Sequence, residues 1–116
     1  MFIVIPTNDR INIEQKSGRA KEFAIFDLNN LNNVIFKENS HKHHDHTDGH
    51  HEHSHKTIID MFRENNVEIL IVDVVGKHFK KDLLEANIKI YKTKLKNLIE
   101  IASSFKNDIN DFEVLG

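Results

Sequence analysis

The sequence predicts a single α/β domain built on a sheet that mixes antiparallel and parallel strands. Two observations favour this class. Short apolar runs typical of strands fill the first part of the chain, whereas helical and strand patterns alternate in the second part. With 116 residues, 39% of them hydrophobic, the chain has enough apolar material for one core and little room for a second.

Three strands are expected near the start of the chain. Residues 2–5 form the first, an apolar run that ends in turn-forming residues. Residues 23–28 and 31–37 form the second and third, separated by a short Asn-Asn turn. Because this join is so short, the second and third strands should pair as an antiparallel hairpin.

Helices and strands alternate after residue 56. The expected elements are a helix from Thr57, a strand over residues 67–72, a helix over 77–86, a strand over 88–91 and a helix from residue 93. Residues 67–72 are almost continuously apolar, which is typical of a parallel strand buried on both faces. The order is βββ-α-β-α-β-α, with helices packed on a five-stranded mixed sheet. Since right-handed crossovers leave few alternatives, we expect the ribonuclease H-like arrangement.

A histidine-rich segment interrupts this pattern after the third strand. Eight of the nine histidines fall between residues 41 and 55, in the run HKHHDHTDGHHEHSHK. The run contains no apolar residue, so residues 39–56 should form a long loop within a single domain over 1–104. Residues 105–116 are expected to form a polar C-terminal tail.

These histidines predict metal binding, because neutral imidazole is the commonest ligand of zinc, copper, nickel and iron. We expect several weak, exchanging sites, and the alternative is a solvated linker with incidental affinity. The segment would also sense pH: two lysines and three carboxylates in residues 41–56 give −1 with neutral imidazoles, and eight protonated imidazoles give +7. The candidate metal ligands are His41, His43, His44, His46, His50, His51, His53 and His55.

Two turns outside this segment are candidates for binding an anion. Gly18 lies between two cations, where backbone N–H groups and the Arg19 guanidinium can face an anion. Gly76 opens a helix at the carboxyl end of a parallel strand, where open α/β sheets place ligands, and His78 follows it. We therefore expect a shallow pocket between the Gly18 and Gly76 turns. The alternative is a pair of exposed turns with solvated side chains.

Composition and motifs argue against several functional classes. Sixteen basic and eighteen acidic residues give a net charge of −2, so neither nucleic acid nor membrane partners are expected. The chain has no cysteine, so any metal must be held by nitrogen and oxygen donors. No apolar stretch approaches the roughly 20 residues of a membrane span, and the apolar start is too short for a signal peptide. We expect a cytoplasmic protein.

An enzyme is not expected either. Ribonuclease H-type catalysis needs several carboxylates that converge on two magnesium ions. The first predicted strand carries no acid, and Asp73 is the only carboxylate well placed at a strand end. The sequence also shows no Ser/His/Asp pattern, phosphate-binding glycine loop or catalytic cysteine.

The chain resembles the dinitrogenase iron–molybdenum cofactor biosynthesis proteins, which are small carriers of nitrogenase metal clusters with a ribonuclease H-like fold. The resemblance covers roughly residues 1–104. It consists of the opening IVIPT over residues 3–7, Gly-Arg-Ala over 18–20, histidines after the third strand, the Gly76 turn and Ala-Asn-Ile over 86–88. Lys-Ser stands where the family usually has His-Phe before Gly-Arg-Ala, so one histidine often implicated in cluster binding is missing.

This resemblance implies a non-catalytic carrier of a metal or metallocofactor, with a recipient protein as partner. Its cargo would be a transition metal ion (Zn, Ni, Cu or Fe) or an iron–molybdenum-type cluster. The candidate cofactor-binding residues are Gly18, Arg19, Gly76 and His78. Two alternatives stay open, a pH- or metal-responsive protein-interaction module and a metal-storage buffer. Both a monomer and a homodimer are compatible with the sequence.

Overall fold

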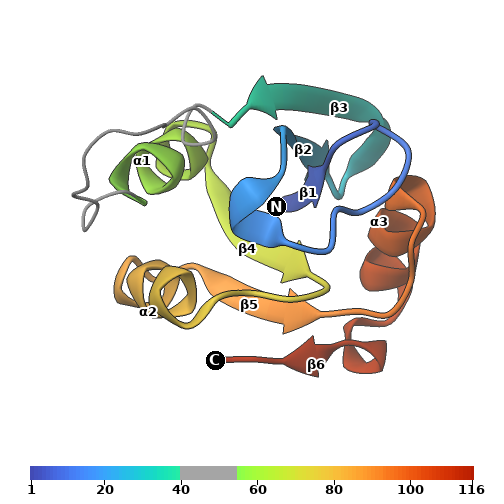
Figure 1. Ribbon diagram of the computed structural model, residues 1–116. Coiled ribbons are helices and arrows are strands. Elements are labelled where there is room, and N and C mark those ends of the chain that lie inside the picture. Colours follow the sequence, from blue (N-terminus) through green and yellow to red (C-terminus); the bar gives the residue numbers. More distant parts are fainter. Residues whose placement is uncertain (40–54) are drawn as a thin grey trace.

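The computed structural model describes residues 1–39 and 55–116, which form a six-stranded sheet and three α-helices (Figure 1). The strands are β1 (Phe2–Thr7), β2 (Glu22–Asp27), β3 (Asn30–Glu38), β4 (Val67–Val72), β5 (Lys89–Lys92) and β6 (Glu113–Val114). The helices are α1 (Lys56–Glu64), α2 (Lys77–Glu85) and α3 (Leu98–Asn107), with short 3-10 helices η1 (Ser17–Arg19) and η3 (Ile109–Asp111). None of the helices in these ranges has the length and apolar character needed to cross a membrane.

The sheet mixes both pairing directions, as predicted. Its strand order is β3-β2-β1-β4-β5-β6. The first three strands pair antiparallel, and β4 pairs parallel with both β1 and β5. The short β2–β3 connection forces an antiparallel hairpin, whereas α2 carries the chain from β4 back to a parallel β5. The prediction of an α/β fold with a mixed sheet and three helices is confirmed.

The expected number of five strands is wrong, because residues near the C-terminus add β6 to the edge of the sheet. β6 pairs antiparallel with Tyr91 and Lys92, and the Leu115 N–H donates to the Ile90 carbonyl at 2.8 Å. Phe112 holds this segment in place, since its buried ring packs edge-on against the Phe105 ring with the ring centroids 5.0 Å apart. A strand of two residues has no periodicity, so the sequence pattern gave no sign of it.

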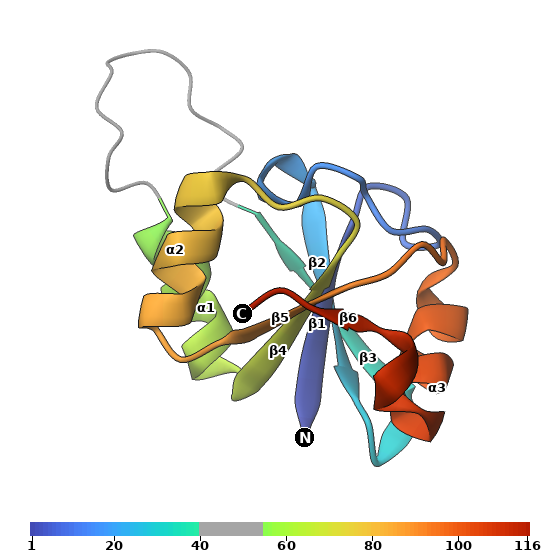
Figure 2. The same ribbon diagram turned by 90° about the horizontal axis from the view of Figure 1, so that it is seen from below.

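The helices cover both faces of the sheet (Figure 2). α1 and α2 lie on one face and α3 on the other. β1 is buried on both faces: Val4 packs with the side of α1 and α2, whereas Ile3 and Ile5 pack with the side of α3. This double burial explains why the central strands are continuous in apolar residues.

Two helix starts differ from those expected. α1 begins at Lys56 with His55 at its N-cap, so Thr57 lies inside the helix. α3 begins at Leu98, five positions after residue 93, because the Asn97 side chain accepts the Glu100 N–H at 3.0 Å and caps the helix there.

Candidate functional site

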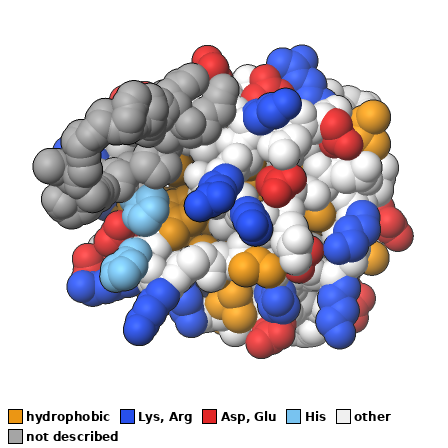
Figure 3. Space-filling model, viewed as in Figure 1, with side chains coloured by type: hydrophobic (Ala, Val, Ile, Leu, Met, Phe, Trp, Pro, Cys, Tyr) orange, Lys and Arg blue, Asp and Glu red, His pale blue; other side chains and the backbone are white. Residues whose placement is uncertain are grey.

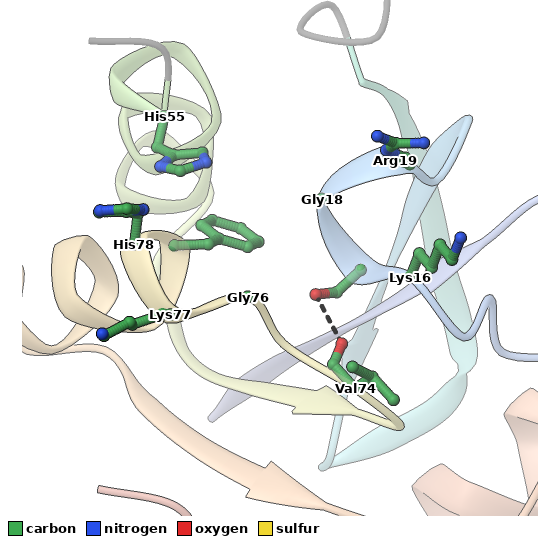
Figure 4. A pocket seen from close by; sticks show the side chains of 10 residues that line it. Lys16, Gly18, Arg19, His55, Val74, Gly76, Lys77 and His78 are labelled. Atoms are coloured by element: carbon green, nitrogen blue, oxygen red, sulfur yellow. Dashed lines mark hydrogen bonds between the residues drawn. The ribbon is translucent and has the colours of Figure 1, made fainter. Parts of the chain in front are cut away.

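A cavity of about 430 Å³ lies beyond the carboxyl end of β4, between η1 and the start of α2 (Figure 4). One wall comes from the η1 turn, and the other comes from the residues that lead from β4 into α2 and from the residue before α1. The lining residues are Lys16, Ser17, Gly18, Arg19, His55, Val74, Gly76, Lys77, His78 and Phe79.

Hydrogen bonds hold the two walls together. Ser17 is buried, with 1% of its surface exposed, and its Oγ donates to the Val74 carbonyl at 3.0 Å (Figure 4). The Ser17 N–H donates to the same carbonyl at 3.4 Å, and the Val74 N–H donates to the Gln15 carbonyl at 3.2 Å. The η1 turn is therefore attached to the segment that continues β4, and this attachment fixes the separation of the Gly18 and Gly76 turns.

Asn39 supports η1 from the other side. This residue follows β3 and is buried, with 1% of its surface exposed. Its Nδ2 donates to the Ala20 carbonyl at 2.8 Å and to the Gly18 carbonyl at 3.3 Å. The turn is thus fixed by the Val74 backbone on one side and by the Asn39 side chain on the other, both distant in the sequence.

The two glycines of the cavity are not required by crowding. A β-carbon at Gly18 would meet Phe79 Cδ2 at 3.8 Å, an ordinary contact, and one at Gly76 would meet nothing within 4 Å. Gly76 is the N-cap residue of α2. Because the first N–H groups of a helix have no intrahelical acceptor, this end of α2 presents N–H donors beside the cavity.

The cavity is cationic. Lys16, Arg19 and Lys77 contribute to its lining, and no Asp or Glu is among the described residues that line it. Figure 3 shows the two described histidines beside hydrophobic side chains, with Lys and Arg side chains across from them. Such a site favours a negatively charged ligand with an apolar or polarisable surface.

Two imidazoles lie on the helical side of the cavity, opposite Arg19 (Figure 4). His55 directly precedes α1, and its carbonyl accepts the Ile59 N–H at 3.0 Å. Its ring stacks on Phe79 with centroids 4.7 Å apart, and its Nδ1 lies 2.8 Å from Asp82 Oδ2. His78 is exposed and belongs to the first turn of α2.

The structure brings together all four residues predicted for cofactor binding, since Gly18, Arg19, Gly76 and His78 line this one cavity. His55, from the predicted metal ligands, joins them. The other seven predicted ligands, His41, His43, His44, His46, His50, His51 and His53, lie outside the described residues. Within residues 1–39 and 55–116, no group of three or more potential ligand side chains comes together. The assignment of these residues as ligands stays a prediction.

Sequence reasoning missed three residues that shape the site. Phe79 reads as a core residue of its helix, and its stacking on His55 depends on how α1 and α2 pack. Asp82 lies within the predicted helix over residues 77–86, and Asn39 lies at the start of the predicted loop over residues 39–56. No local signal marks any of them, because each acts on a residue at least 19 positions away or on another helix.

The fold and the cavity together define a class of protein: a small α/β protein with a mixed sheet and a cationic cavity beside a helix N-terminus. The sequence matches the family model for the dinitrogenase iron-molybdenum cofactor over residues 1–107, and the chain belongs to this family. The resemblance noted from the sequence motifs is thus confirmed. No curated protein matches the chain.

Solved structures share the fold at low sequence identity. The apo form of the orange protein from Desulfovibrio gigas has a TM-score of 0.79 and 14% identity, over 99% of this chain and 92% of that chain. A NifB candidate from Thermotoga has a TM-score of 0.70 and 22% identity, over 98% and 92%. A dinitrogenase candidate from Methanocaldococcus jannaschii has a TM-score of 0.70 and 18% identity, over 100% and 95%. At these identities the likeness concerns the fold.

Proposed function

We propose that this chain is a non-catalytic carrier that holds an anionic metal cluster of the iron–molybdenum type as cargo. The observation that carries the proposal is the cavity itself, which combines Lys16, Arg19 and Lys77 with two imidazoles and has no carboxylate among its described lining residues. Membership of the iron–molybdenum cofactor family supports a cluster as the cargo. We also class the fold as ribonuclease H-like, because the order β3-β2-β1-β4-β5 has the expected pairing directions.

Each part of the cavity would act on the cargo in a different way. The Arg19 guanidinium would donate hydrogen bonds to sulfide or oxygen atoms at the cluster surface, and the α2 N-terminus would add further favourable potential. His78 would bind a metal atom of the cluster, and the lysines would balance its charge. Ligand exchange at imidazole nitrogen would then pass the cluster to a recipient protein in the cytoplasm.

The test is anaerobic loading of the full-length protein with iron–molybdenum cofactor, followed by gel filtration and elemental analysis of bound iron and molybdenum. Arg19→Gln removes a charge-assisted hydrogen bond, so the affinity of this variant for the cofactor should fall by about 10-fold or more. Arg63→Gln is the matched control, because Arg63 lies on α1 outside the lining of this cavity. Equal loading of the two variants, or no loading of the wild type, would contradict the proposal.

The histidine-rich sequence favours a second candidate function, either a metal-storage buffer or a pH- or metal-responsive protein-interaction module. In that case residues 41–53 would bind ions by themselves, and the folded part would serve as a scaffold. A variant with its seven histidines replaced by Asn separates the two functions. The carrier should keep its cluster and lose most of its capacity for Zn²⁺ or Ni²⁺, whereas a buffer should lose all of its metal binding.

A further inference from the structure

Of the two histidines among the described residues, His55 is the more constrained. Its backbone is fixed at the start of α1, its ring stacks on the buried ring of Phe79 at an interplanar angle of 29°, and its Nδ1 contacts a carboxylate of α2. Only 20% of the His55 side chain is exposed, and it still contributes to the cavity lining. A ring that is held by stacking and by a hydrogen bond has little rotational freedom left to lose on binding.

We propose that Asp82 is a positioning residue that prepares His55 as a fixed imidazole ligand for a metal atom in the cavity. The carboxylate at 2.8 Å accepts the Nδ1–H of His55. In the neutral ring the lone pair then lies on Nε2, which is the form that binds metal. Histidines that ligate metals commonly make this contact to a carboxylate, which fixes the tautomer and makes the imidazole a stronger donor.

The position of His78 strengthens this inference. His78 and Asp82 are four residues apart on α2, so they lie on the same face of the helix. His55 and His78 consequently lie on the same side of the cavity (Figure 4). The site thus offers two imidazoles, one held in place and one exposed.

Two imidazoles are too few to complete the coordination of a bare ion, and the described residues bring no third donor to them. This arrangement suits a metal that brings its own ligands, such as an atom at the edge of a sulfide-bridged cluster. The choice of such a metal complex rests on the proposed carrier function. The roles of His55 and Asp82 can be tested without it, using Zn²⁺ as the probe, because water can fill the coordination positions that the protein leaves open.

The experiment uses the full-length chain with the seven histidines at 41–53 replaced by Asn, which leaves His55 and His78 as its only imidazoles. Long-range ¹H–¹⁵N NMR spectra report which nitrogen of each ring is protonated. We expect His55 to carry its proton on Nδ1, and Zn²⁺ to shift its Nε2 signal. In this background Asp82→Ala should weaken Zn²⁺ binding by about 10-fold and let both His55 tautomers appear.

Glu85→Ala is the matched control, because it removes a carboxylate from the same helix that pairs with Lys81 and lines no part of this cavity. It should leave Zn²⁺ affinity and the His55 tautomer unchanged. Asp82→Asn keeps the shape of the side chain and serves if Asp82→Ala fails to fold. Its Zn²⁺ affinity should lie between those of wild type and Asp82→Ala.

Three results would overturn the inference: Zn²⁺ shifts at His78 alone, a His55 proton on Nε2, or equal Zn²⁺ affinities for the Asp82 and Glu85 variants. Failure of the protein to load iron–molybdenum cofactor, with the Zn²⁺ and NMR results as expected, would remove the proposed cargo and leave the His55 assignment standing. Successful loading of the cofactor together with any of the three contrary results would leave the carrier function standing and remove the His55 assignment.

Discussion

Replacing Ser17 with Ala tests whether the walls of the cavity are held together as the structure indicates. The substitution removes one hydroxyl, whose Oγ donates to the Val74 carbonyl at 3.0 Å from a side chain that is 1% exposed. It leaves the backbone almost untouched, because the Ser17 N–H still donates to the same carbonyl at 3.4 Å.

The expected cost follows from this residual bond. A buried acceptor left without any donor costs about 1–3 kcal/mol, whereas one ordinary hydrogen bond contributes about 1 kcal/mol. Since the Val74 carbonyl keeps one long hydrogen bond, it is not left without a donor. The substitution should therefore lower the free energy of unfolding by about 1 kcal/mol, the contribution of one ordinary hydrogen bond. For a chain of 116 residues this corresponds to a fall in Tm of about 4 °C.

Urea and thermal unfolding of the full-length variant measure this change. The control is Ser103→Ala, a half-buried serine on α3, where alanine should be neutral or stabilise the helix by up to about 0.5 kcal/mol. Equal stabilities of the two variants would refute the reasoning, since the Ser17 hydroxyl would then contribute nothing to the attachment of η1.

Two further predictions concern the edge of the sheet and the loop after β1. Phe112→Ala should lower the free energy of unfolding, measured in urea, by about 3 kcal/mol, because the ring is buried. Ile109 is exposed, so Ile109→Ala should lower it by less than about 1 kcal/mol. Similar losses for the two variants would contradict the packing of β6. The backbone N–H groups of Asn12 and Ile11 hold the pKa of Asp9 below its ordinary value. The unfolded chain therefore binds the proton more readily, so Asp9 stabilises the fold above about pH 4, and this contribution is lost as the pH falls through the lowered pKa. Asp9→Asn should thus unfold with a lower free energy than wild type at pH 7, and this difference should disappear in acid. A difference in the free energy of unfolding that stays constant from pH 7 to 3 would contradict the prediction.

The sequence by itself determined the α/β class and the order of most elements. Residues 67–72 are apolar at nearly every position because β4 is buried on both faces, so composition alone revealed a parallel strand. The short Asn-rich turn fixed the hairpin of β2 and β3. The sequence marked Gly18 as a candidate anion-binding turn because cations flank it, and it marked Gly76 because the carboxyl end of a parallel strand is where such sheets place ligands.

Only the tertiary structure decided β6 and the wall of the cavity beside α2. β6 has two residues and depends on Phe112 reaching the Phe105 ring, a contact that no local pattern encodes. His55 and Asp82 are 27 positions apart, one at the N-cap of α1 and the other on α2, and they meet because α1 and α2 pack on the same face of the sheet. The sequence carries the chemistry of these side chains, but their distances depend on the packing of the whole core.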